Sequence, residues 1–175
     1  MPSADRALAN ASVALDDLLR RLEIEVLRFE HPAVMTVEEA DRCEPTLPGA
    51  KTKNLFLRDK KGARHFLVTV PAHRPVDLPL LGTALEAGRL GFASAERLHR
   101  YLGITPGAVS LLALINDADG SVEFAIDRTL WEADAVQAHP LVNTATLVLT
   151  HDGLSRFLSA TGHAPRIVDI AAAAR

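Results

Sequence analysis

The sequence predicts a mixed α/β fold in which a mainly antiparallel β-sheet or barrel is surrounded by helices. Short apolar runs are paired around charged turns, as in β-hairpins, and amphipathic segments with helical spacing lie between them. Strands and helices do not alternate regularly, which argues against a doubly wound parallel sheet. The chain has 175 residues, of which 48% are apolar and 23% charged. These totals favour one globular domain over residues 1–175.

The first third of the chain is predicted to contain two helices, a strand and a hairpin. Apolar residues recur at helical spacing over 8–22, and 24–29 is expected to be a strand. Thr36 begins a capping-box sequence and therefore predicts a short helix. Residues 53–70 consist of two apolar runs around a charged turn with Gly62, which is typical of a β-hairpin.

Two further helices are predicted in the middle of the chain. Asp77 and Ser94 are each followed by a helical pattern and are therefore expected to be N-caps. Gly88 and Gly103 stand where left-handed glycines commonly end helices. Each helix would then span little more than two turns.

The last part is predicted to begin with a second hairpin. Its strands would be 109–117 and 121–127 around a turn at Gly120, and Asp117 is assigned to the turn. The remaining predicted elements are a strand at 145–150, a helix at 151–162 capped by Thr150, and a strand at 166–170.

Composition excludes several classes of protein. No apolar run is long enough to cross a bilayer, and the N-terminus lacks the apolar stretch of a secretory signal. The protein is therefore expected to be cytoplasmic and not to associate with a membrane. The single cysteine, Cys43, excludes an internal disulfide framework. The net charge of −3 argues against a general nucleic-acid or DNA binder, although the basic run 51–64 could contact a few phosphates or simply be solvated.

Most catalytic motifs are absent. The seven histidines do not have ligand spacing, so neither a metal nor another cofactor is expected. No nucleophile elbow occurs, although a triad of distant residues remains open. Polar residues instead interrupt apolar elements in three segments, 48–54, 103–110 and 139–146.

These segments carry a family resemblance. The chain resembles the YbaK/ProX superfamily of tRNA-editing domains, which also occur inserted in bacterial prolyl-tRNA synthetases. Within this superfamily it is most similar to the free-standing deacylases of Ala-tRNA(Pro), called ProXp-ala or PrdX. The resemblance covers about residues 20–170, which are expected to be the core of the domain. The matching segments are HPAVMTVEEA (31–40), LPGAKTKNLFLRDKKG (47–62), VDLPLL (76–81), 92–117 and HPLVNTATLVLT (139–150).

The resemblance implies a set of site residues. Lys53 matches the functional lysine of the family and is expected to anchor a phosphate or ribose, while His139 is a candidate general base. Residues 107–111 match the glycine-containing loop of the family, in which Leu111 replaces the proline that usually ends it. The implied substrate-binding residues are Asn54, Gly107, Ala108, Val109, Ser110, Asn143 and Thr144.

Each of these residues also has a structural interpretation. Lys53 could be a solvated strand-edge lysine, and His139 could cap or pack. Asn143 and Thr144 could stabilise a turn, and His31 could belong either to a pocket wall or to a simple turn.

The implied activity is hydrolysis, in trans, of alanine from tRNA for proline. An activated ester needs a positioned water and stabilisation of the carbonyl oxygen, to which backbone N–H groups near 107–110 could contribute. The implied partners are the acceptor end of aminoacyl-tRNA and, as a second candidate, prolyl-tRNA synthetase. Two alternatives stay open: another mischarged tRNA such as Cys-tRNA(Pro), and a non-catalytic module that binds tRNA or the synthetase.

Overall fold

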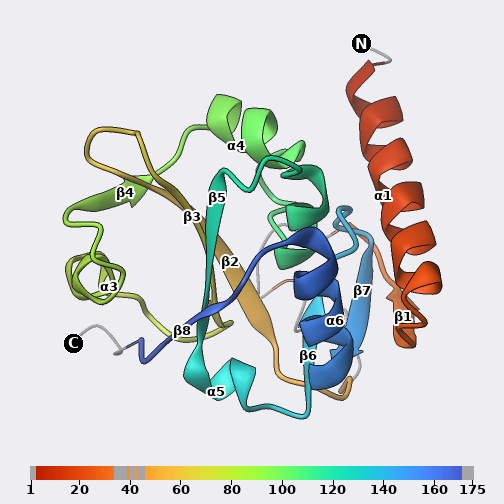
Figure 1. Ribbon diagram of the computed structural model, residues 1–175. Coiled ribbons are helices and arrows are strands. Elements are labelled where there is room, and N and C mark those ends of the chain that lie inside the picture. Colours follow the sequence, from red (N-terminus) through yellow and green to blue (C-terminus); the bar gives the residue numbers. More distant parts are fainter. Residues whose placement is uncertain (1–2, 34–38, 40–41, 43–45, 171–175) are drawn as a thin grey trace.

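The computed structural model describes residues 3–33, 39, 42 and 46–170, and Figure 1 shows two open sheets with helices around them. The larger sheet has the strand order β4-β2-β3-β5-β8, and the smaller has the order β1-β7-β6. The strands are β1 (Val26–Glu30), β2 (Thr52–Asp59), β3 (His65–Pro71), β4 (Leu90–Phe92), β5 (Val122–Asp127), β6 (Ala135–Ala138), β7 (Ala145–Thr150) and β8 (Arg166–Val168). The helices are α1 (Ser3–Arg21), α3 (Leu78–Ala84), α4 (Ala95–Leu102), α5 (Arg128–Trp131), α6 (His151–Thr161) and the 3-10 helix η1 (Leu111–Asn116).

The mixed α/β class is confirmed, and most strand pairs are antiparallel. Only β5 pairs in parallel, with β3 on one side and β8 on the other. The barrel alternative is wrong for the described residues, because the three-residue strands β4 and β8 end the larger sheet without pairing with each other. One isolated bridge, between Ala50 and Val136, connects the two sheets.

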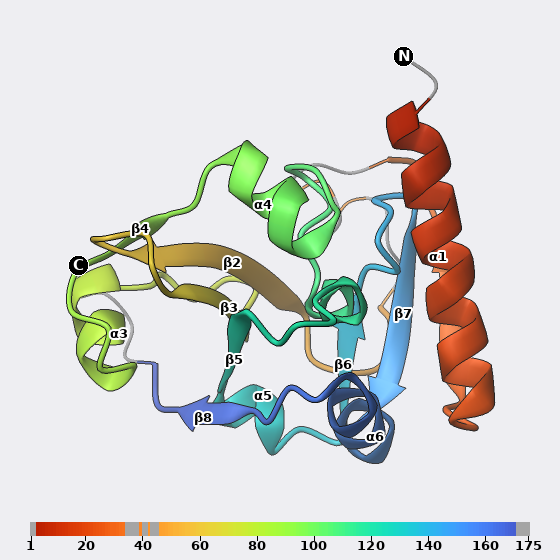
Figure 2. The ribbon, with the colours of Figure 1, turned by 45° about the horizontal axis from the view of Figure 1, so that its top comes forward.

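Two apolar clusters cover the two faces of the larger sheet. The larger cluster lies between this sheet, η1, α6 and the smaller sheet, and the side chains of Leu15 and Leu19 join it from α1. Figure 2 shows α1 on the side of the molecule away from the turn between β2 and β3. The smaller cluster lies under α3 and includes Leu57 and Val70.

The predicted caps are largely confirmed. The side chains of Asp77, Ser94 and Thr150 accept hydrogen bonds from the backbone N–H groups of the first helical turns. Gly103 ends α4 in the left-handed region at φ 63°. Gly88 is also left-handed, but α3 ends earlier, with Leu85 as its C-cap, so the predicted end of this helix is wrong.

The second predicted hairpin is wrong. Residues 111–116 form the 3-10 helix η1, which Ser110 caps, and β5 pairs with β3 instead. A continuous apolar run fits a buried strand and a buried helical turn equally well, and the four residues 111–114 are all buried. The hairpin at 53–70 is confirmed as β2 and β3, with Gly62 at φ 68° in its turn. Thr36 and Cys43 lie outside the described residues.

Three short elements were not predicted from the sequence: β4, α5 and β6. Each has at most four residues, so too few side chains repeat to give a period. In the described part of the chain, every helix is too short or too polar to span a bilayer.

Candidate functional site

The entrance of β2 is held against β6 by a series of hydrogen bonds. The Thr52 hydroxyl donates to the Gln137 carbonyl over 2.7 Å, although the two residues are 85 positions apart. The Ala50 N–H donates to the Ala135 carbonyl, and the Gln137 N–H donates to the Ala50 carbonyl. The Gln137 amide nitrogen reaches the carbonyls of residues 47–49 at 3.2 Å. The segment before Lys53 is therefore attached to the strand that leads into His139.

His139 follows β6 and is half-buried. Its Nδ1 lies 2.9 Å from the Ala145 carbonyl. A carbonyl can only accept a hydrogen bond, so Nδ1 carries a proton, and in the neutral form of the ring the lone pair is therefore on Nε2. The His31 ring lies edge-on to the His139 ring, with centroids 6.1 Å apart. His139 is therefore oriented by its own turn, as a general base requires.

Ser110 joins the glycine-containing loop to His139. Its hydroxyl donates to the His139 carbonyl over 2.6 Å and accepts from the Leu112 N–H over 3.2 Å. The side chain is fully buried. Two predicted site segments, 29 residues apart, are thus joined by one buried side chain.

The loop before Ser110 is only partly available to a substrate. Gly107 has φ 90°, which favours glycine, and Val109 is half-buried. Ala108 is buried, and its N–H donates to the Thr105 carbonyl. Leu111, which replaces the usual proline, is fully buried in the larger cluster and therefore contributes to packing.

The turn after His139 has a strained backbone. Leu141 has φ 66° and is completely buried, an uncommon combination for a leucine. Asn143 is half-buried and Thr144 is exposed, and the Thr144 carbonyl accepts from the His31 N–H at 2.9 Å. The structure therefore brings Asn143 and Thr144 together with His139 and adds His31 to the same region.

His31 also contacts the next strand. Its Nε2 lies 3.0 Å from the Thr146 hydroxyl, and its Nδ1 lies 2.8 Å from the Pro32 carbonyl. The side chain thus has a polar partner on each ring nitrogen. Sequence reasoning left open whether His31 belongs to a wall or to a turn, and it missed Thr146 and Gln137. Gln137 gave no signal in the sequence, because β6 was not predicted and the burial of its side chain is visible only in the fold.

Lys53 and Asn54 lie on opposite faces of β2. Strand alternation puts Lys53 on the face of Leu57, which packs in the smaller cluster, and Asn54 on the face of Phe56. The Asn54 side-chain carbonyl accepts from the Thr69 hydroxyl at 2.7 Å. Asn54 thus shares a face with η1 and β6. Lys53 is half-buried and would approach that region around the entrance of β2.

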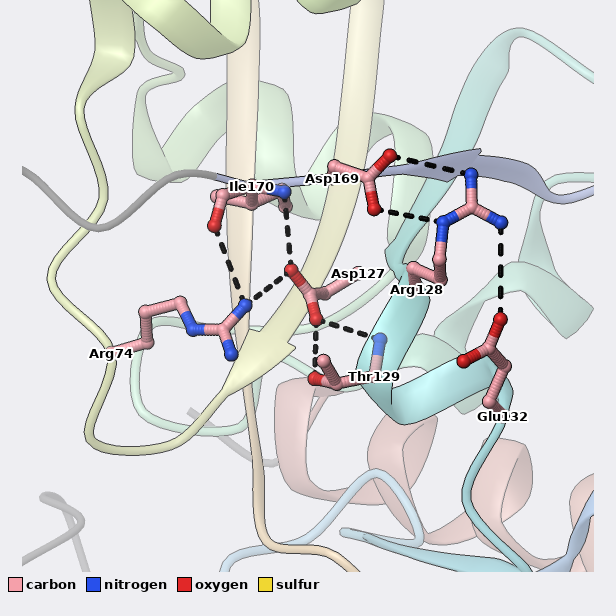
Figure 3. Close-up of polar contacts among 7 residues, drawn as sticks. All are labelled: Arg74, Asp127, Arg128, Thr129, Glu132, Asp169 and Ile170. Atoms are coloured by element: carbon pink, nitrogen blue, oxygen red, sulfur yellow. Dashed lines mark hydrogen bonds and ion pairs between the residues drawn. The ribbon is translucent and has the colours of Figure 1, made fainter.

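A separate polar hollow of about 190 Å³ lies where β5 ends and α5 begins, and its lining includes Asp127, Arg128 and Asp169. Figure 3 shows that its charges are paired: the buried Asp127 carboxylate accepts from Arg74, Thr129 and the Ile170 N–H. Arg128 binds Asp169 at 2.8 Å. The hollow includes none of the predicted site residues. Its ion pairs attach the chain after β8 to the sheet, so we interpret it as structural.

Within the described residues, no group of three or more histidine, cysteine or acidic side chains is arranged to hold a metal ion. The polar groups around His139 are instead hydroxyls, amides and imidazoles.

Comparisons with known proteins agree with this fold and with the order of these segments. A model of the aminoacyl-tRNA editing domain family matches residues 31–157. The prolyl-tRNA editing protein ProX of Acetoanaerobium sticklandii is 35% identical over 161 residues, which cover 92% of this chain and 98% of that protein. The prolyl-tRNA synthetase associated domain-containing protein 1 of Danio rerio is 42% identical, over 88% of this chain and 84% of that protein.

Two solved structures share the fold. The hypothetical protein APE2540 matches with a TM-score of 0.70 at 18% identity, over 89% of this chain and 97% of its own. A structure described as a candidate trans-editing enzyme for prolyl-tRNA synthetase matches with a TM-score of 0.62 at 22% identity, over 97% of this chain and 98% of its own. The family match, the two relatives and the common fold lead to one conclusion: the chain belongs to the aminoacyl-tRNA editing domain family, in the YbaK/ProX superfamily.

Proposed function

We propose that this protein is a trans-acting editing hydrolase that deacylates mischarged tRNA for proline, with Ala-tRNA(Pro) as its substrate. The hydrogen bond from the buried Ser110 to the His139 carbonyl is the observation that carries the proposal, because it fixes the glycine-containing loop beside an oriented imidazole. The class of substrate comes from the names of the relatives, which include a prolyl-tRNA editing protein.

The reaction is hydrolysis of the ester between the amino acid and the terminal ribose. A water attacks the carbonyl carbon, the ester bond breaks, and the ribose oxygen leaves with a proton. In the proposed mechanism the lone pair on His139 Nε2 takes the proton from the attacking water. The N–H group of the half-buried Val109 stabilises the negative charge on the carbonyl oxygen, since the N–H of Ala108 is already bonded and Ser110 is fully buried.

Lys53 is assigned an anchoring role. A lysine is protonated at neutral pH and cannot act as a base. It lies at the entrance of β2, on the face of the strand opposite to Asn54. A cation at the strand entrance suits a phosphate or the ribose of the terminal nucleotide.

Selection of alanine over proline would be steric. A synthetic site built for proline cannot strongly exclude alanine, because a few missing methylenes cost only about 1–3 kcal/mol. A second pocket too small for the pyrrolidine ring hydrolyses whatever enters it. Val109 and Val142, both half-buried beside the proposed site, are the branched side chains assigned to its wall.

The direct test incubates the purified protein with labelled Ala-, Pro- and Cys-tRNA(Pro) in the presence of a chelator. The expected result is release of alanine, retention of proline and no effect of the chelator. Release of cysteine alone would select the alternative substrate. Binding of all three without hydrolysis would select the non-catalytic module. The proposed partners are the acceptor end and, as a second candidate, prolyl-tRNA synthetase, in the cytoplasm where translation takes place.

Variants of His139 separate catalysis from positioning. His139→Asn keeps an N–H that can donate to the Ala145 carbonyl but removes the basic nitrogen. We expect His139→Asn and His139→Ala each to lower kcat by about 10²–10⁴-fold. If His139→Asn keeps wild-type kcat, the imidazole only holds the turn.

A second pair of variants tests Lys53. Lys53→Ala should nearly abolish turnover without changing the circular dichroism spectrum, and Lys53→Arg, which keeps the charge, should recover part of the activity. Unchanged rates in Lys53→Ala would remove this residue from the mechanism.

A further inference from the structure

A cluster of cations lies at the far end of β2 from the proposed site. It comprises Arg58 at the end of β2, Lys60 and Lys61 in the following turn, and Arg97 and Arg100 on α4, and we name it the hairpin-tip patch. Lys60, Lys61 and Arg100 are exposed, and Arg58 and Arg97 are half-exposed. Figures 1 and 2 show the β2–β3 turn on the side of the molecule away from α1, with α4 between the turn and α1.

The structure holds the two halves of the patch together. One Arg97 nitrogen donates to the Gly62 carbonyl at 3.1 Å and lies 2.8 Å from Nε2 of His65. The buried His65 ring packs on Tyr101 of α4, with centroids 4.1 Å apart. Since arginine only donates, His65 accepts through Nε2 and is neutral. The cations on α4 therefore have a defined position relative to the turn.

Electrostatics around His65 support this grouping. The pKa of His65 lies below its ordinary value, first because the ring is buried and then because of nearby charges. The cations that lower it are Arg97, Arg100 and Arg58, whereas Asp59 opposes them. Three members of the patch thus act on one buried ring.

The charges of the patch are largely unneutralised. Among the described residues, none of its five cations forms an ion pair with a carboxylate, whereas the neighbouring Arg64 is paired with Glu123 at 2.7 Å. Two acidic side chains lie close in sequence, Glu96 on α4 and Asp59, whose carboxylate accepts from the N–H groups that follow it in the turn. A positive field therefore remains on a protein whose net charge is −3.

We propose that the hairpin-tip patch is the surface on which phosphates of the tRNA acceptor stem dock. This inference rests on the proposed function, and it deepens it by naming where the substrate lies beyond its aminoacylated end. Asp59 lies six residues after Lys53 along β2, a distance of about 20 Å at the rise of an extended strand. The single-stranded end of a tRNA covers that distance in a few nucleotides. The stem phosphates would then reach the patch while the ester lies at the entrance of β2.

The test measures binding of uncharged tRNA(Pro) by fluorescence anisotropy over a series of salt concentrations. Lys60→Gln/Lys61→Gln should weaken binding about tenfold and lower the slope of log affinity against log salt by about one to two, since each phosphate contact contributes about 0.9. The matched control is Arg20→Gln/Arg21→Gln, which removes two exposed charges at the end of α1 and should leave both quantities unchanged. The affinity of the trinucleotide CCA, which lacks the stem phosphates, should be the same for both variants as for the wild type.

Three results would overturn the inference. If the lysine variant keeps the wild-type affinity and slope, the patch does not bind RNA. An acidic protein partner would then be the remaining candidate for this surface. Equal losses in both variants would indicate a general effect of net charge. Weaker binding of CCA would indicate that the lysines lie at the acceptor end. Because uncharged tRNA is not hydrolysed, these outcomes do not depend on whether the protein proves to be a deacylase.

Discussion

Replacement of Ser110 by alanine tests how strongly the glycine-containing loop is joined to His139. The buried Ser110 hydroxyl makes two hydrogen bonds, one to the carbonyl of the half-buried His139 at 2.6 Å and one from the buried Leu112 N–H at 3.2 Å. Ser110→Ala removes both and leaves a carbonyl and an N–H unpaired in the core. Each unpaired group costs about 1–3 kcal/mol, so we expect the free energy of unfolding to fall by about 2–6 kcal/mol.

Ser94 provides the matched control. It also caps a helix, but it is exposed and its hydroxyl accepts only from the Arg97 N–H, at 3.2 Å. Ser94→Ala should therefore cost about 1 kcal/mol, the usual contribution of an N-cap. Urea unfolding followed by circular dichroism measures both variants on the same scale. The loss of unfolding free energy in Ser110→Ala minus that in Ser94→Ala gives what the bond to the His139 carbonyl adds beyond an N-cap.

Activity gives a second measurement of the same change. Loss of the Ser110 bond should loosen the turn that orients His139, so kcat should fall in Ser110→Ala and stay constant in Ser94→Ala. Equal free energies of unfolding for the two variants would refute the reasoning, because they would show that the bond to the His139 carbonyl adds nothing beyond a cap.

Two further predictions concern the fold. The pKa of His65 is lowered in the folded protein, so the unfolded chain takes up its proton first as the pH falls below about 6.5. Stability should therefore decrease from pH 7 to pH 5, by at most about 1.4 kcal/mol per pH unit for this group, and His65→Gln should reduce that dependence in urea titrations. A pH profile identical to that of the wild type would contradict the assignment. Gly82→Ala should destabilise the protein by about 1–3 kcal/mol, because its Cβ would lie 2.0 Å from the Gly88 carbonyl oxygen. In Gly91→Ala the added Cβ meets no atom within 4 Å, so this variant should be nearly as stable as the wild type. Thermal melts measure the stability of both variants.

Local signals predicted much of the architecture. N-caps depend on one side chain and the backbone immediately after it, and Asp77, Ser94 and Thr150 were identified for that reason. The hairpin at 53–70 was recognised because two apolar runs and a glycine turn are adjacent in the chain. The family of the chain was also recognisable from short segments, and a model of that family matches residues 31–157.

Contacts between distant segments decided the rest. Residues 111–116 have no hydrophobic period that would distinguish a strand from a 3-10 helix. Their secondary structure depends on their burial between α4, α6 and the larger sheet. Parallel pairing of β5 with β3 likewise depends on strands far apart in the chain. The sequence placed Lys53 and Asn54 together as neighbours, whereas the pleat of β2 puts them on opposite faces. The sequence by itself predicted which residues form the site; only the tertiary structure determined which of them meet, because hydrogen bonds such as that from Ser110 to His139 join residues with no local relation.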